Sequence, residues 1–172
     1  PSLHQDEFNR EGKEVILVES MHPDPNQIMI ETIFASRTAK ELGAKKVTIV
    51  APYLAYMRQD KRFHPRECKS NTIMSALLTC GDRIMTVDPH LHRISSLSEI
   101  FTIPAKRLSA NDAIAEYIKK NIKNEVIVGP DSESYQWAKA IADKINVHAT
   151  VLKKKRYTSR HVRIKVKSDI DF

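Results

Sequence analysis

Glycine is scarce in this sequence, and its scarcity excludes several classes of nucleotide-binding protein. The 172 residues include four glycines, Gly12, Gly43, Gly81 and Gly129, and the closest two are 31 positions apart. Glycine-rich phosphate loops of the dinucleotide, Walker and kinase types need glycines a few residues apart, and so does a Gly-x-Ser-x-Gly nucleophile elbow. Any phosphate chemistry must therefore rest on helix N-termini, on lysine and arginine side chains, or on a metal ion.

Cysteine and long apolar runs are also scarce. Cys68 and Cys80 are too few for a disulfide framework and lack the spacing of a zinc site, so we expect reduced thiols and no zinc. No apolar run approaches the roughly 18 residues of a membrane span, and the first residues lack the pattern of a signal peptide. The composition is typical of a cytoplasmic protein with no membrane contact.

Positive charge is concentrated near the end of the chain. The formal net charge is +7, yet residues 1–151 hold 20 basic and 19 acidic side chains. The remaining residues hold eight bases and two acids, and four of the bases form the run 153–156. Such a run indicates a solvated face or a nucleic-acid patch more often than a catalytic element.

Short β-branched runs alternate with segments of helical period. Pro23 and Pro25 separate the first run from the first helical segment, Gly43 is a natural C′ residue for that helix, and Ser70, Asn111 and Ser132 are candidate caps of later helices. This alternation favours an α/β fold with a parallel sheet built from βαβ units. We expect strands at 14–19, 46–51, 83–87, 125–128 and 147–152, and helices at 27–42, 71–80, 112–122 and 133–145.

A domain boundary is expected near residues 104–110, after Pro104, where the alternation restarts. We assign residues 1–105 to a first, complete or nearly complete α/β domain and 106–172 to a second. The second is short for a complete doubly wound domain and ends without a further helix, so we expect it to be truncated.

Three segments are candidates for chemistry because ligands of open parallel sheets bind beyond the carboxyl ends of the strands. The segment 53–67 combines basic side chains with Tyr and Phe, as a nucleotide site requires, although a solvated loop has the same composition. The segment 88–93 places an aspartate beside two histidines, which is neither a zinc signature nor the preferred ligand set of Mg²⁺. The segment 129–134 places Asp131 at a turn that opens a helix, where a carboxylate is often a simple cap.

Four motifs in register resemble the ribose-phosphate pyrophosphokinases, also called phosphoribosyl pyrophosphate synthetases. They are Tyr-Leu-Ala-Tyr-Met-Arg-Gln-Asp-Lys at 53–61, Val-Asp-Pro-His at 87–90, Gly-Pro-Asp at 129–131 and Lys-Lys-Arg at 154–156. The resemblance covers residues 12–163 and is strongest to a bacterial branch with Pro-His-Leu-His at the second motif. It implies two phosphoribosyltransferase-like domains of type I, and transfer of the pyrophosphoryl group of Mg-ATP to ribose 5-phosphate, a transferase reaction of nucleotide biosynthesis.

The resemblance also implies the residues that bind ATP. Arg58 and Gln59 carry over from an Arg-Gln pair that contacts ATP, and Asp60 and Lys61 lie beside them. His90 carries over from a histidine that touches the metal and the triphosphate. Phosphoryl-group transfer depends mainly on alignment and on neutralisation of charge by Mg²⁺, lysine and arginine, and these residue types suit that chemistry.

The remaining roles fall in the second domain. Asp131 carries over from an aspartate that faces the metal and the ribose phosphate. Lys154 and Arg156 carry over from catalytic residues of a mobile flag that closes over the reacting phosphates, and residues two apart on an extended strand project to the same side. The family further implies a homo-oligomer.

The sequence departs from the family in three places. Arg66 stands where the family typically has glycine, the adenine-clamping loop has no clear match in residues 1–11, and the Asp-Asp…Thr-Gly-Gly-Thr loop for ribose 5-phosphate is missing. We therefore expect this chain alone to be inactive. The alternatives are a non-catalytic nucleotide-binding or regulatory relative and, ranked last, an RNA-binding module that uses the basic tail.

Overall fold

The structure is a computed structural model that describes residues 11–123, 125–132, 134–156 and 162–166, the backbone alone at 153–156 and 162–166. The chain divides into two compact units, residues 1–108 and 109–172, and each is described here by itself. The boundary predicted after residue 105 falls inside the last strand of the first unit.

The first unit is built on a parallel sheet of four strands in the order β1-β2-β3-β4. Three of the strands were predicted, and so was their parallel arrangement, but the fourth was not. This strand is short and holds two exposed bases, as edge strands often do, so it lacks the apolar run by which a strand is recognised. The strands are β1 (Glu14–Val18), β2 (Lys46–Ala51), β3 (Arg83–Val87) and β4 (Ala105–Leu108).

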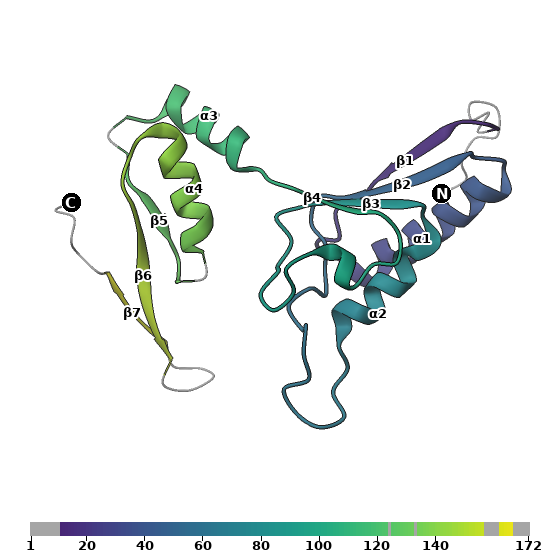
Figure 1. Ribbon diagram of the computed structural model, residues 1–172, viewed down its shortest axis with the longest axis horizontal. Helices are drawn as coiled ribbons and strands as arrows, with labels where there is room; N and C mark the ends of the chain where they lie inside the picture. Colours follow the sequence, from purple (N-terminus) through teal and green to yellow (C-terminus); the bar gives the residue numbers. More distant parts are fainter. Residues whose placement is uncertain (1–10, 124, 133, 157–161, 167–172) are drawn as a thin grey trace. The chain divides into compact units, whose positions relative to one another are not determined.

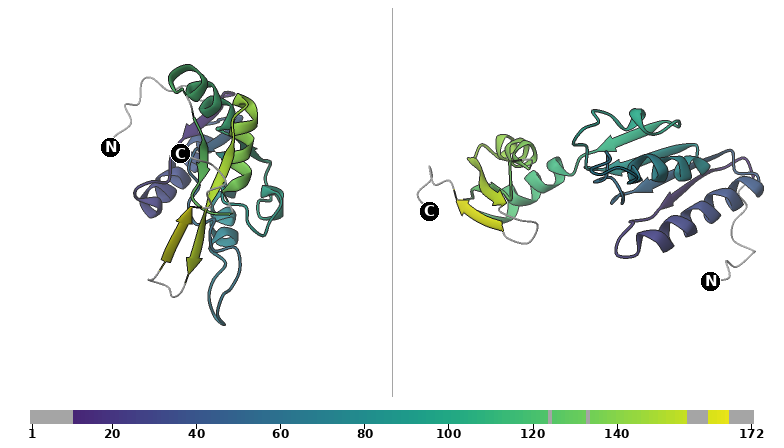
Figure 2. Two further views of the ribbon diagram at one scale, coloured as in Figure 1. Left: turned by 90° about the vertical axis from the view of Figure 1, so that its left-hand side faces the viewer. Right: turned by 90° about the horizontal axis from the view of Figure 1, so that it is seen from below.

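Two helices cover one face of this sheet (Figures 1 and 2). Helix α1 (Pro25–Glu41) starts with a proline, whose missing N–H is no loss in a first turn. It ends before Gly43, whose φ of +82° is the left-handed conformation expected of a C′ glycine. Helix α2 (Ser70–Leu77) is shorter than predicted because a 3₁₀ turn, η1 (Leu78–Cys80), replaces its last turn.

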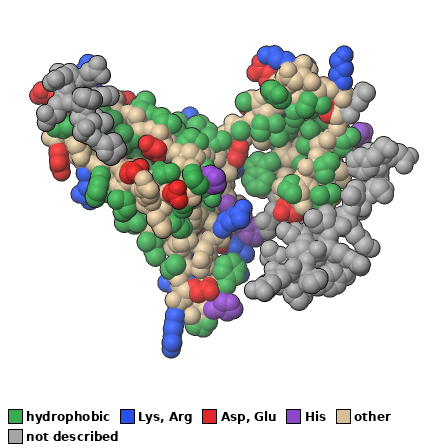
Figure 3. Space-filling view, turned by 180° about the vertical axis from the view of Figure 1, so that it is seen from behind, with side chains coloured by type: hydrophobic (Ala, Val, Ile, Leu, Met, Phe, Trp, Pro, Cys, Tyr) green, Lys and Arg blue, Asp and Glu red, His purple; other side chains and the backbone are tan. Residues whose placement is uncertain are grey.

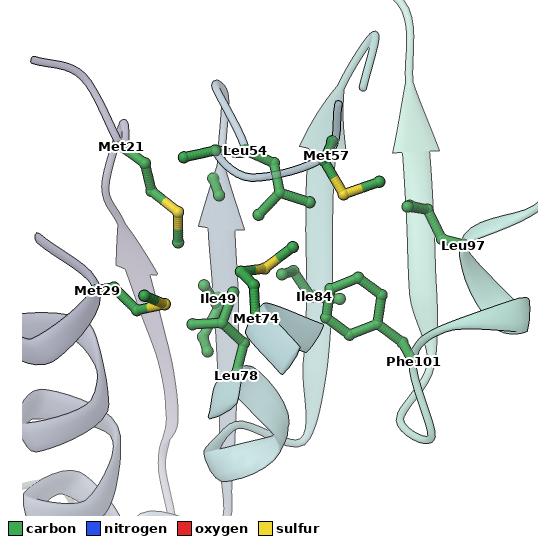
Figure 4. Packing of buried hydrophobic residues seen from close by; sticks show 12 residues of the cluster. Met21, Met29, Ile49, Leu54, Met57, Met74, Leu78, Ile84, Leu97 and Phe101 are labelled. Atoms are coloured by element: carbon green, nitrogen blue, oxygen red, sulfur yellow. The ribbon is translucent and has the colours of Figure 1, made fainter. Parts of the chain in front are cut away.

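The core of the first unit lies between these helices and the sheet (Figure 4). The apolar side chains of β2 and β3 that face the helices are buried, and methionines from α1, α2 and the loops fill the space between them. Twelve residues form the cluster: Met21, Met29, Ile49, Ala51, Leu54, Ala55, Met57, Met74, Leu78, Ile84, Leu97 and Phe101. Three of them, Leu54, Ala55 and Met57, belong to the segment after β2, so the core also anchors that segment.

The second unit combines two helices with a three-stranded sheet (Figure 1). Strands β5 and β6 are parallel, as predicted, but β6 continues four residues further and pairs with an antiparallel strand, β7, that was not predicted. A run of four basic residues has no apolar alternation, so the sequence did not show this hairpin. The elements are α3 (Asn111–Asn121), β5 (Ile127–Gly129), α4 (Tyr135–Ile145), β6 (Ala149–Arg156) and β7 (Val162–Val166).

The predicted helix caps are wrong in detail. Lys69, Ala110 and Ser134 hold the N-cap positions of α2, α3 and α4, and none of them makes a side-chain capping bond. The Ser70 hydroxyl instead donates to the carbonyl of Tyr56 at 2.9 Å, which ties α2 to the loop after β2. Tertiary contacts therefore override the local capping preference at this helix.

Gly129 ends β5 at a point of close packing. A Cβ at this position would lie 2.6 Å from Ser134 Oγ and 2.9 Å from Val151 Cγ1, closer than real contacts allow. Glycine is required here by the approach of the α4 entrance to the sheet. None of the helices in the described part of the chain has the length and apolar character needed to cross a bilayer.

Candidate nucleotide site

The candidate site of the first unit lies where β2 and β3 end. The two strands are neighbours and run parallel, so the segments that follow them leave the sheet at the same edge. The N–H of Val87 donates to the carbonyl of Pro52 at 3.4 Å at this edge. The structure thus brings together the segment with Arg58 and Gln59 and the segment with His90, as the parallel topology predicts.

The segment after β2 alternates buried anchors with exposed polar residues. Leu54, Ala55 and Met57 are buried in the core, whereas Arg58 is exposed and Gln59 half-buried. Tyr56 takes a positive φ of 62°, and its hydroxyl contacts Asn26 Oδ1 at the start of α1. These anchors hold the start of the segment against the sheet, so it is more than the solvated loop that its composition allowed.

Asp60 is buried, although it lies in a highly charged stretch. Its side chain is 1% exposed, and Arg93 Nη1 donates to its Oδ1 at 2.7 Å. Burial acts to raise the pKa of Asp60, but the hydrogen bond and the positive charge of Arg93 outweigh it, so this pKa lies below its usual value. Asp60 therefore stays ionised and joins the segment after β2 to the segment after β3.

Phe63 forms a second link between these segments. Lys61 Nζ lies 4.9 Å and Arg93 Cζ 5.6 Å from the centre of the Phe63 ring, within the range of cation–π attraction. The ring itself is 54% exposed. Lys61 and Arg93 are thus held beside the same aromatic side chain, and Arg93 is a residue that the sequence reasoning missed.

A tight turn follows Phe63, and Glu67 closes it. Its Oε2 accepts hydrogen bonds from the N–H groups of Phe63 and His64, at 2.9 and 3.1 Å, and its carbonyl accepts one from Arg62 Nε. Arg66 has a φ of +74°, in the region that favours glycine. The turn therefore has the backbone conformation that suits a glycine at position 66, although the residue is arginine.

The segment after β3 is held by β4. Asp88 has a φ of +39°, its N–H donates to the carbonyl of Leu108 at 3.0 Å, and its Oδ1 lies 3.8 Å from Arg107 Nη2. His90 follows at the same edge, half-buried, with its ring 6.0 Å from that of His92. The unpredicted strand thus supplies the support for the segment that contains His90.

On the face of the first unit that Figure 3 displays, several basic side chains and histidines lie close together, with acidic side chains on the same face. Arg58, Lys61, Arg62 and His92 are exposed, and Arg93 is 37% exposed at its side chain. Charge of this kind near the end of a parallel sheet suits an anionic ligand.

In the second unit, Asp131 is part of the α4 entrance. Its Oδ1 accepts the N–H of Ser134 at 3.0 Å, and its own N–H and carbonyl bond the Ser134 hydroxyl. The bond from the Ser134 N–H closes the turn before α4 and does not cap the first turn of the helix, so the cap considered for Asp131 from the sequence is not formed. A carboxylate that accepts one N–H retains acceptor capacity for a cation. The backbone of Lys154 and Arg156 lies in β6, opposite Ile164 and Val162 of β7.

A metal ion would need more ligands than the described residues supply. Among the described residues, no three His, Cys, Asp or Glu side chains lie close enough to hold a metal ion together. His90 and Asp131 belong to different units, so their convergence stays a prediction. Mg²⁺ commonly binds one or two carboxylates and completes its shell with waters and substrate phosphates, and Asp131 offers one such carboxylate.

Comparisons with known proteins match both units. Residues 5–81 match the model for the N-terminal domain of ribose phosphate pyrophosphokinase, and residues 96–169 match that for the phosphoribosyl transferase domain. A ribose-phosphate pyrophosphokinase of Methanobrevibacter smithii is 36% identical over 83% of this chain and 48% of its own length. One from Saccharolobus solfataricus is 35% identical over 92% of this chain and 55% of its own length.

A solved structure agrees with these relatives. The crystal structure of phosphoribosylpyrophosphate synthetase from Mycobacterium smegmatis matches with a TM-score of 0.75 and 28% identity, over 92% of this chain and 53% of that chain. The chain therefore spans about half the length of the relatives it matches, and the predicted α/β fold with phosphoribosyltransferase-like units is confirmed.

Proposed function

The chain belongs to the ribose-phosphate pyrophosphokinase family, and on this premise we propose that it forms the ATP-binding part of an enzyme that converts Mg-ATP and ribose 5-phosphate to phosphoribosyl pyrophosphate and AMP. The main support is the meeting of two loops at one edge of the first sheet, one with Arg58 and Gln59, the other with His90.

The residues of the first unit bind and orient the nucleotide. Arg58 is exposed and donates to phosphate oxygens, which guanidinium groups bind with two parallel hydrogen bonds. Gln59 and Lys61 supply further donors, and Lys61 is held beside Phe63. His90 contributes to the triphosphate and the metal. The loops thereby concentrate positive charge where the phosphates lie, as phosphoryl-group transfer requires.

The residues of the second unit act on the reacting groups. Mg²⁺, when bound, neutralises phosphate charge and polarises the bond that is broken. Asp131 faces the metal and the ribose phosphate, and Lys154 and Arg156 stabilise the transferring group as catalytic residues. This assignment rests on the family resemblance, as do the cytoplasmic location, the homo-oligomer and the placement in a bacterial branch.

Calorimetric titration with ATP, with and without Mg²⁺, tests the proposal. We expect this chain to bind Mg-ATP, and we expect Arg58→Gln to weaken binding about tenfold or more, which corresponds to about 1.4 kcal/mol. Arg83→Gln, at the opposite end of β3, is the matched control because it removes the same charge and should bind as the unsubstituted chain does.

The titration, an assay of AMP formation and an RNA-retention assay together separate the alternatives. Equal affinities of Arg58→Gln and the unsubstituted chain would contradict the assignment of Arg58. Binding of Mg-ATP by the whole protein without formation of AMP from added ribose 5-phosphate would support a non-catalytic relative. Retention of RNA with steep salt dependence, and no binding of ATP, would support the RNA-binding module.

A further inference from the structure

Arg93 and Asp60 form an ion pair between two segments that are 33 residues apart in the sequence. Arg93 follows β3 and Asp60 follows β2, so the bond crosses from one candidate ATP-binding segment to the other. Asp60 lies within two residues of Arg58, and Arg93 lies three residues from His90. Asp60 belongs to the motif 53–61 and Arg93 ends the segment 88–93, but the sequence does not show that they pair.

The burial of Asp60 shows that it does not face solvent as its neighbours do. Its side chain is 1% exposed, whereas Arg58, Lys61 and Arg62 are exposed. Its second oxygen, Oδ2, is buried without a hydrogen-bond partner among the residues that the structure describes. A carboxylate in this position depends on Arg93 for compensation of its charge, because a buried charge without a partner is strongly unfavourable.

Phe63 adds a contact of a different kind between the same two segments. Its ring lies beside both Lys61 and Arg93, so the guanidinium of Arg93 has one anionic and one aromatic neighbour. A planar guanidinium is suited to such a combination, since it can donate in its plane and pack through its face. Arg93 is therefore the point at which the two segments are joined.

We propose that Arg93 is a positioning residue, which fixes the Arg58 and Gln59 segment against the His90 segment, and that Asp60 acts through Arg93 rather than by contact with ATP. The inference rests on the proposed function for the identity of the ligand. Repulsion between the exposed cations of the first segment and Arg93 would separate the two segments, and the negative charge of Asp60 opposes this separation. Small displacements of binding groups are costly, with about 1 Å lowering rates about 100-fold in unfavourable cases.

The experiment compares Asp60→Asn, Arg93→Gln and the double variant with the unsubstituted chain. Urea denaturation measures stability, calorimetry measures the Mg-ATP affinity, and amide hydrogen exchange measures the order of residues 53–67. Each single variant should lose stability because one charged or polar partner is left without the other. The double variant should regain stability, since neither charge then remains buried alone.

In the double variant, stability should recover while the Mg-ATP affinity and the exchange of residues 53–67 should not. We expect its Mg-ATP affinity to stay about tenfold or more below that of the unsubstituted chain, and exchange at 53–67 to stay fast, although stability recovers. Arg93→Lys should restore part of the affinity because it keeps the charge but not the planar group. Arg83→Gln again controls for the change in net charge.

Two results would overturn the inference. One is recovery of both stability and affinity in the double variant, which shows a purely structural pair. The other is unchanged exchange at 53–67 in Arg93→Gln. If the unsubstituted chain binds no Mg-ATP, the proposed function fails, and the exchange of residues 53–67 in the double variant decides the inference by itself: fast exchange supports it and native exchange contradicts it.

Discussion

The two units differ in how much apolar surface they bury. The first encloses the twelve-residue cluster between two helices and four parallel strands. In the second, the buried apolar side chains among the described residues are Ala115, Ala138, Ile141 and Ala142, and three of these four are alanines. Since stabilisation grows with buried apolar area, the first unit should hold its fold more firmly than the second. The segments that follow β2 and β3, which hold the candidate site, are thus attached to the firmer unit.

Among the changes considered, removal of a large core side chain should have the largest effect on the stability of one unit. Ile49 is fully buried in β2, and Ile49→Ala should lower the free energy of unfolding of the first unit by about 2–5 kcal/mol. Amide hydrogen exchange of β2 and β3 measures the loss. Trp137, the single tryptophan, lies in α4, so its fluorescence follows the second unit.

We expect the fluorescence transition of Ile49→Ala to stay where it is in the unsubstituted chain. Ile141→Ala, the matched change in α4, should move that transition and leave β2 unaffected. A common shift of both probes in either variant would show that the units unfold together and would contradict the comparison.

Gly129→Ala is expected to have an intermediate effect, confined to the second unit. The added Cβ would collide with Ser134 Oγ and Val151 Cγ1, and such overpacking costs about 1–3 kcal/mol. The Trp137 transition in urea should move to lower concentration. Gly12→Ala separates backbone strain from overpacking. A Cβ at Gly12 would meet no atom within 4 Å, so any loss of stability there comes from the positive φ of Gly12.

Acid should weaken the first unit by a smaller amount through Asp82. The hydrogen bond from Lys40 lowers the pKa of Asp82, and the N–H of Val47 acts in the same direction against burial. Because the folded pKa is below the unfolded value of about 3.9, the contribution is complete above that pH and is lost as pH falls through the folded pKa.

Lys40 and Asp82 are both partly exposed, so acidification should lower the free energy of unfolding by only about 0.2–1 kcal/mol. Hydrogen exchange of the β2 amides, followed as a function of urea concentration at pH 6 and at pH 3, measures this loss of stability. Asp82→Asn should be less stable than the unsubstituted chain at pH 6 and should lose less between the two values. The same pH dependence in both proteins would rule out this role for Asp82.

The sequence predicted the strands and helices of the first unit well because their signals are local. Buried parallel strands such as β2 and β3 read as apolar runs, and Gly43 marks the end of α1. The edge strand β4 and the β6–β7 hairpin carry charged residues in place of such runs. The pairing of β4 depends on β3, about 20 residues earlier, and the β6–β7 hairpin joins strands that lack an apolar run, so a local pattern shows neither.

The candidate site was predictable in its segments but not in its connections. Arg58, Gln59 and His90 follow from the motifs and lie at the expected edge of the sheet. The sequence assigned no role to Arg93 or Glu67. Arg93 takes part through its bond to Asp60, and Glu67 through the turn that it closes, and neither contact is visible in the sequence. Arg66 stands where the family typically has glycine, and its backbone has a positive φ that favours glycine, so the residue differs while the turn does not. Whether Asp131, Lys154 and Arg156 join the site stays a prediction.

The strand order of the first sheet also bears on how the protein is made. Each strand from β2 to β4 pairs with the one that precedes it along the chain. No strand must wait for a later strand, so the sheet can grow by one strand at a time in the order of synthesis, with one crossover connection to close at each step. The first unit can thus assemble on the ribosome before the second unit has emerged.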